Sequence, residues 1–213
     1  MVSTLAAPAA LFSAPVNECD RVARIAAQEH GVPFKVMAAI ARVETGRTID
    51  GDFQPWPWTL NVAGDGAHFP TRSEALQAMH HVTATGQSNF DVGCFQVNAR
   101  WHGDQFDTAQ TMIDPLENAR YAAGLLVEHF EVTQDWTLAA GRYHSKTQDF
   151  ATAYIEKFTD VLNALPDLAT PSRPTSKREN SFPLLIVQDG VTVRRGSLVP
   201  ITTDASRSRL IGG

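Results

Sequence analysis

Glu44 is the residue in this sequence best placed for acid–base chemistry, because it closes a segment that is apolar almost all round. Residues 34–45 (FKVMAAIARVET) carry apolar side chains over most of a helical circumference, which is typical of a buried helix. Glu44 follows Ile40 by four residues and therefore projects from the buried side. Burial of the carboxylate and its place at a helix C-terminus both raise its pKa. The pattern predicts a protonated general acid; an ion pair with Arg42 or Arg47 is the alternative.

A second group of polar residues lies in the segment 91–98 (DVGCFQVN). Gly93 permits a turn with positive φ. Gln96 and Asn98 alternate with apolar residues, so both amides could face a cleft and exchange hydrogen bonds with sugar hydroxyl and N-acetyl groups. A turn whose polar residues face water is the alternative. Asp91 is the residue that could serve as a second carboxylate in a hydrolytic reaction.

Two aromatic segments add further candidates. Tyr143, in the sequence AGRYHS at a predicted helix end, could hydrogen-bond the carboxyl of Glu44 or stabilise charge in a transition state, although a tyrosine on a helix also suits the core. Trp56 and Trp58 lie in residues 53–69 (FQPWPWTLNVAGDGAHF). Because aromatic faces stack on sugar rings, this segment could form a cleft wall; a hydrophobic cap over extra core volume is the equal alternative.

In their order along the chain, ETG, GCFQVN and RYHS, followed by an amphipathic helix, resemble the soluble lytic transglycosylase (SLT) family. Its motifs are a Glu followed by a small hydroxyl residue, a Gly-Leu-Met-Gln-like turn and an Ala-Tyr-Asn-like segment. The matching residues are Glu44 and Thr45, then Gly93, Cys94, Phe95 and Gln96, then Tyr143 and His144. Cys, Phe and His at their positions depart from the pattern. The resemblance covers about residues 19–165 and is closest to exported transglycosylases associated with flagellar assembly or type IV secretion.

The resemblance implies a goose-lysozyme-like fold and cleavage of peptidoglycan glycan strands. Glu44 would be the single catalytic acid/base, oriented by Tyr143, and the product would carry a 1,6-anhydro-N-acetylmuramic acid end. The substrate-binding residues would be Thr45, Gly93, Phe95, Gln96, Asn98, His144 and Trp58. Neither a cofactor nor a metal ion is implied. A hydrolytic muramidase and a non-catalytic glycan-binding or assembly module are the alternatives.

The spacing of apolar and capping residues predicts a mainly α domain over residues 17–165, with roughly six helices and an inserted loop and helix segment between Glu44 and Gly93. Short strand pieces are expected near residues 58–69 and 94–97. Cys19 and Cys94 could form a disulfide or remain two buried thiols.

The two ends of the chain carry different signals. Residues 1–16 are small and apolar and resemble the end of a secretory signal without its basic region, which predicts export to the periplasm; a flexible N-terminus is the alternative. Residues 166–213 begin with a Pro- and Ser-rich linker and predict a flexible tail that docks a flagellar or secretion-system protein.

Charge and hydropathy argue against a nucleic-acid partner and against a transmembrane segment. The formal net charge is −5 without a run of Lys or Arg, which argues against nucleic acid as the main partner. Since no window holds 18 consecutive apolar residues, a transmembrane segment is not expected.

Overall fold

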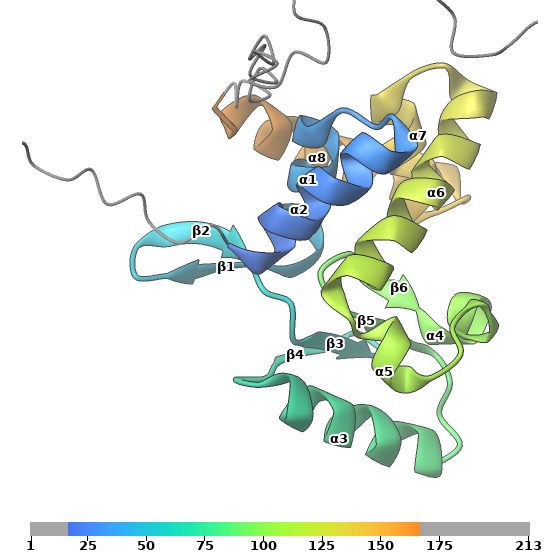
Figure 1. The fold of residues 1–213 in the computed structure, drawn as a ribbon. Helices are drawn as coiled ribbons and strands as arrows, with labels where there is room; N and C mark the ends of the chain where they lie inside the picture. The colour runs from blue at the N-terminus through green and yellow to red at the C-terminus, as the bar shows by residue number, and fades with distance from the viewer. Residues whose placement is uncertain (1–16, 167–213) are drawn as a thin grey trace, which may run out of the picture. The chain divides into compact units, whose positions relative to one another are not determined.

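The fold, taken from a computed structural model that describes residues 17–166, is mainly helical, as the sequence predicted (Figure 1). The helices are α1 (Glu18–His30), α2 (Phe34–Thr45), α3 (Arg72–Ala84), α4 (Ala99–His102), the 3-10 helix η1 (Gly103–Gln105), α5 (Ala109–Met112), α6 (Pro115–Thr133), α7 (Trp136–His144) and α8 (Gln148–Ala164). Among the described residues, six of these have nine or more residues, which matches the predicted number. The N-terminal segment 1–16 and, apart from Pro166, the predicted tail lie outside the described residues.

Local side-chain signals fix where the helices begin and end. The side chain of Asn17 accepts hydrogen bonds from the first backbone amides of α1, and Gly31 ends that helix in the left-handed conformation. Asp114 caps α6, with Pro115 in its first turn, and Asp135 caps α7. Thr71 accepts from the Glu74 amide at the start of α3.

Two small antiparallel sheets complete the described part of the chain. One is the hairpin of β1 (Gly46–Ile49) and β2 (Asp52–Pro55); the other has the order β4-β3-β5-β6, from β4 (Asp65–His68), β3 (Thr59–Val62), β5 (Phe90–Val92) and β6 (Val97–Asn98). The second sheet agrees with the strand pieces expected near residues 58–69, but β1 and β2 were not predicted. Their residues are largely exposed and lack an alternating apolar pattern, so the sequence carries no strand signal there.

The elements divide into a helical part and a part built on the larger sheet. α1 packs against α2 and α6, α2 packs against α8, and α7 packs against both α6 and α8. Figure 1 shows these helices gathered at one end, with β3–β6 and α3 at the other. The arrangement brings the C-terminal end of α2 towards the strands that carry the second motif.

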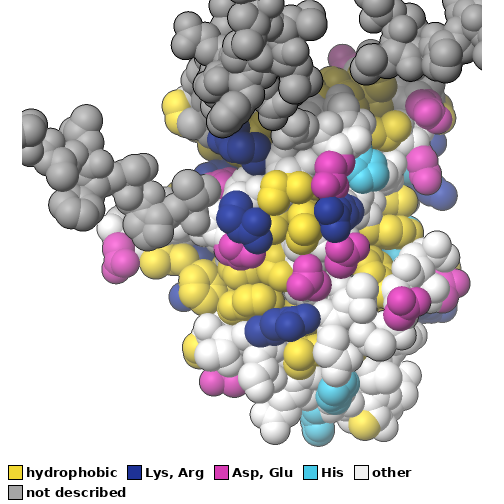
Figure 2. All heavy atoms as spheres, viewed as in Figure 1, with side chains coloured by type: hydrophobic (Ala, Val, Ile, Leu, Met, Phe, Trp, Pro, Cys, Tyr) yellow, Lys and Arg dark blue, Asp and Glu magenta, His cyan; other side chains and the backbone are white. Residues whose placement is uncertain are grey.

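Acidic and basic side chains are interspersed on the face shown in Figure 2. Arg21 pairs with Glu18 on α1, while Arg120 pairs with Glu117 on α6 and with Glu29 on α1. These pairs are largely exposed and contribute little to stability. Their mixing leaves no continuous basic surface on this face.

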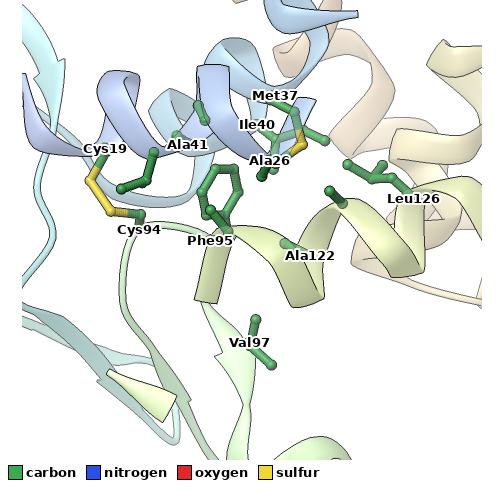
Figure 3. Packing of buried hydrophobic residues seen from close by; sticks show 14 of the residues in the cluster. Cys19, Ala26, Met37, Ile40, Ala41, Cys94, Phe95, Val97, Ala122 and Leu126 are labelled. Carbon is green, nitrogen blue, oxygen red and sulfur yellow. A yellow bond between two sulfur atoms is a disulfide. The ribbon is translucent and has the colours of Figure 1, made fainter. Parts of the chain in front are cut away.

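The core is centred on Phe95, whose ring lies among side chains of α1, α2 and α6 (Figure 3). Met37, Ile40 and Leu126 around it are fully buried, as are both cysteines. Cys19 and Cys94 form a disulfide, which decides between the two alternatives left open by the sequence. Truncating a ring buried this deeply costs about 3–5 kcal/mol, so the turn that carries Phe95 is anchored by its own side chain.

The last helix differs at its start from what its apolar spacing predicts. The spacing predicts that Phe150 shares one buried side with Tyr154 and Phe158, but Phe150 is 64% exposed. The buried face at this level is formed by Ala151, whose backbone approaches Gly141 of α7 closely. Contact between small residues lets the two helix backbones come together and leaves no room for a phenyl ring there.

Candidate active site

A polar cleft of about 330 Å³ lies between the helical part and the larger sheet. It is lined by Glu44 at the end of α2, Asn61 of β3, Asp91 of β5, Gln96 in the turn before β6, Val97 and Asn98 of β6, Trp101 and His102 of α4, Leu125 of α6, and Tyr143 and His144 of α7. The structure thus brings together residues from all three sequence motifs, although about 100 positions separate the first from the last.

Glu44 has the properties of a general acid. Partial burial of its carboxyl is the main cause that raises its pKa, to about 7. The hydroxyl of Tyr154 donates a hydrogen bond to Glu44 Oε1 over 2.7 Å, which stabilises the carboxylate and opposes this rise, and the negative charge of Asp91 adds to it. A carboxyl with this pKa is protonated in a large fraction of molecules at neutral pH and still releases its proton readily.

The tyrosine that orients Glu44 is Tyr154 of α8, not Tyr143. The Tyr143 hydroxyl instead donates to the backbone oxygen of Phe95 over 2.7 Å, so Tyr143 fixes the turn of the second motif while still lining the cleft. Burial, followed by the charge of Glu44, raises the pKa of Tyr143 well above its usual value. The sequence did hold a signal for Tyr154, because a phenol within an apolar helix face requires a partner for its hydroxyl.

His144 packs against the ring of Tyr154. The two rings stack with centroids 4.5 Å apart and planes inclined by 11°. Burial, followed by the positive charge of Lys157, lowers the pKa of His144. The imidazole is therefore mainly neutral at pH 7 and can both donate and accept hydrogen bonds.

The turn of the second motif is shaped by two residues with positive φ. Gly93 has a φ of +79°, and a Cβ there would come within 2.9 Å of the Asn118 side chain. Gln96 has a φ of +47°, which is uncommon for a residue with a side chain. Its Nε2 donates to the backbone oxygens of Gly93 and Thr59, so its Oε1 is the amide atom left to accept from a substrate.

Asn98 lines the cleft, but its polar atoms are already engaged. Its Nδ2 donates to Asp91 Oδ1 over 2.8 Å and to Asn89 Oδ1 over 3.0 Å, and its Oδ1 caps α4. In the structure Asn98 therefore positions Asp91, and its contact with a sugar stays a prediction. Burial raises the pKa of Asp91, and the bond from Asn98 opposes that rise.

Four predicted binding residues do not line the cleft. Thr45 is buried, with its Oγ1 donating within 3.0 Å of the Ala41 oxygen and accepting from the Trp56 amide. Phe95 is in the core, Trp58 packs against it, and Gly93 is buried beside Asn118. Packing, backbone conformation and, for Thr45, hydrogen bonds account for these residue types in the structure.

Trp101 and His102 also line the cleft, although neither was among the residues predicted from the sequence. The Trp101 side chain is 68% exposed, and the Arg100 guanidinium lies 5.0 Å from its ring centre. His102 Nδ1 is 2.9 Å from the Tyr121 hydroxyl. An exposed tryptophan at the rim of a polar cleft offers a flat apolar face, and its place three residues after Asn98 was the signal that could have identified it.

Among residues 17–166, no group of three or more His, Cys, Asp or Glu side chains is arranged to hold a metal ion. In the same part of the chain, no helix is both long and apolar enough to cross a membrane. In comparisons with known proteins, neither a family model nor a curated protein nor a solved structure matches this chain.

Proposed function

We propose that this protein is a peptidoglycan lytic transglycosylase with Glu44 as its single catalytic acid/base. The observation that carries the proposal is a carboxyl with a pKa of about 7, held by Tyr154 and lining a polar cleft. The ordered motifs of the SLT family, two of which contribute side chains to this cleft beside Glu44, support the same assignment. The mainly helical fold is compatible with a lysozyme-like domain.

In the first step, Glu44 donates its proton to the glycosidic oxygen between N-acetylmuramic acid and N-acetylglucosamine. The bond from C1 to that oxygen breaks, and the positive charge at C1 is stabilised by the N-acetyl group of the same sugar. The hydrogen bond from Tyr154 becomes stronger as Glu44 becomes a carboxylate, so it stabilises the transition state more than the ground state.

In the second step, the Glu44 carboxylate accepts the proton of the C6 hydroxyl of the same muramic acid residue. The C6 oxygen attacks C1 and closes the 1,6-anhydro ring. An intramolecular nucleophile has a high effective concentration and can compete successfully with water. Glu44 ends the cycle protonated, so the reaction needs neither a second carboxylate nor a cofactor.

The other cleft residues suit a polar polymer. Gln96 Oε1 and the His144 ring can exchange hydrogen bonds with hydroxyl and N-acetyl groups. Trp101 offers a face for stacking on a sugar ring at the cleft rim. The disulfide is typical of proteins that fold in an oxidising compartment, which favours an exported, periplasmic protein. Within this proposal, the enzyme makes local openings in the cell wall for an envelope machine that the tail recruits.

Asp91 gives specific support to one alternative, a hydrolytic muramidase. It lines the same cleft, and its negative charge helps to raise the pKa of Glu44. Held by Asn98, it could act on a water molecule as a base or stabilise the charge at C1.

Purified sacculi digested by the wild type, Glu44→Gln and Asp91→Asn test the proposal. Release of soluble fragments should fall to background for Glu44→Gln and persist at a reduced rate for Asp91→Asn. If Asp91→Asn lost activity as completely as Glu44→Gln, the result would favour the two-carboxylate muramidase. A Glu44→Gln variant as active as the wild type would contradict both reactions, and an inactive wild type would leave a glycan-binding module.

A further inference from the structure

The disulfide joins two parts of the chain that the catalytic cleft depends on. Cys19 lies in the first turn of α1, and Cys94 lies in the turn between β5 and β6, with Cα atoms 5.7 Å apart. The two cysteines are 75 residues apart in sequence, so the closed loop contains both carboxylates of the cleft, Glu44 and Asp91. Figure 3 shows the bridge running from α1 to the segment that precedes Phe95.

Cys94 is also connected to the cleft through its own backbone and its neighbours. Its carbonyl oxygen lies 3.3 Å from Oγ1 of Thr45, the residue that follows Glu44. The next residue, Phe95, accepts the hydrogen bond of Tyr143, which lines the cleft. The residue after that is Gln96, whose side chain also lines it. Movement of Cys94 would therefore be transmitted to three of the groups around Glu44.

The conformation of this turn needs external restraint. Gln96 is a residue with a side chain at a φ of +47°, and such conformations persist where surrounding contacts hold them in place. Asn118 provides one restraint, because its Oδ1 accepts from the Phe95 amide over 3.1 Å. The disulfide provides a covalent restraint on the opposite flank of the turn, towards α1.

We infer that the Cys19–Cys94 disulfide is a positioning device for the reaction, which fixes the turn 93–96 against Glu44 so that only the oxidised chain is catalytically competent. The inference rests on the proposed function. Two thiols lose two protons and two electrons to a disulfide-bearing oxidant, which is reduced to two thiols. Neither cysteine has exposed surface in the folded protein, so a thiol reagent cannot reach the bridge without an opening of the fold. Oxidation is thus a maturation step set during folding.

The test compares the oxidised wild type with Cys19→Ala/Cys94→Ala on a soluble peptidoglycan oligosaccharide. Val22→Ala is the matched control, because Val22 is fully buried on the same helix and its truncation lowers stability while leaving the disulfide in place. At a temperature where all three proteins are folded, kcat of the double variant should fall at least about tenfold, since small misplacements of catalytic groups have large effects. The control should keep kcat within about twofold. Equal kcat for the wild type and the double variant would overturn the inference, as would an equal loss of kcat in the control.

A second measurement applies if the double variant does not fold. The wild type is unfolded in denaturant and refolded with and without a dithiol, and activity and far-ultraviolet circular dichroism are compared in the two refolded samples. Native ellipticity without activity in the reduced sample supports a positioning role, whereas loss of both reduces the bridge to a purely structural one and overturns the inference.

The positioning role can also be tested if the protein does not cleave glycan. If the oxidised wild type cleaves no glycan, the positioning role is read from the titration of the Glu44 carboxyl by carbon NMR. Its midpoint, about 7 in the oxidised protein, should move down in the disulfide-free variant, or in the dithiol-reduced wild type, because a loosened turn admits water. An unchanged midpoint would overturn the inference independently of the reaction.

Discussion

Replacing Tyr154 by Phe should shift the pH dependence of cleavage in a direction set by one hydrogen bond. The Tyr154 hydroxyl donates to Glu44 over 2.7 Å and favours the carboxylate. A hydrogen bond to a charged group contributes ~1.5–3 kcal/mol, and one pKa unit corresponds to ~1.4 kcal/mol. Loss of the bond should therefore raise the pKa of Glu44 from about 7 by about one to two units.

The general acid must be protonated, so the alkaline limb of kcat/KM should move to higher pH in Tyr154→Phe. The plateau below that limb should fall about tenfold, because the carboxylate formed in the transition state loses its partner. The assay is a pH–rate profile on a soluble glycan oligosaccharide. Tyr143→Phe is the control, since its hydroxyl bonds the Phe95 oxygen instead, and its alkaline limb should move much less. An unshifted limb in Tyr154→Phe, or a shift to lower pH, would refute the reasoning.

Three further changes have effects that follow from burial and exposure. The pKa of Glu44 is raised in the folded state from 4.5 to about 7, so the folded chain binds more protons than the unfolded chain between these pH values. The free energy of unfolding therefore falls as pH rises through this range. Glu44→Gln should remove up to ~3 kcal/mol of that fall, measured by urea unfolding at pH 5 and pH 8. Asn118→Ala should cost about 3 kcal/mol or more in the same assay, because a fully buried amide donates to Val92 and Met112 oxygens and accepts from Phe95. Trp101→Ala should leave stability within about 0.5 kcal/mol but raise KM about three- to tenfold, as an exposed stacking face is lost; an unchanged KM would remove Trp101 from the binding surface.

The helices were predictable because their signals are local. Asn17, Asp114 and Asp135 bind backbone amides of the residues just after them, and Gly31 adopts its conformation independently of distant contacts. The hairpin of β1 and β2 was missed because its strands are short and exposed. The hairpin follows directly after α2, and the pattern of apolar residues carries no signal for strands at that point.

The position of Glu44 was predictable from the sequence, whereas its hydrogen-bond partner was not. Glu44 could be placed because burial near a helix end follows from periodicity along one segment. Tyr154 is 110 positions away from it, and its selection over Tyr143 depends on how α8 packs beside α2. Asn98 offered the right functional groups, but its bond to Asp91 arises from strand pairing, which the sequence does not specify.

Chemical analysis of the glycan ends released from peptidoglycan tests the central claim most directly. The account predicts that the wild type releases fragments ending in 1,6-anhydro-N-acetylmuramic acid, each lighter by one water than the hydrolytic product, and that Glu44→Gln releases none. Fragments with free reducing ends as the main wild-type product, or anhydro fragments that persist in Glu44→Gln, would contradict it.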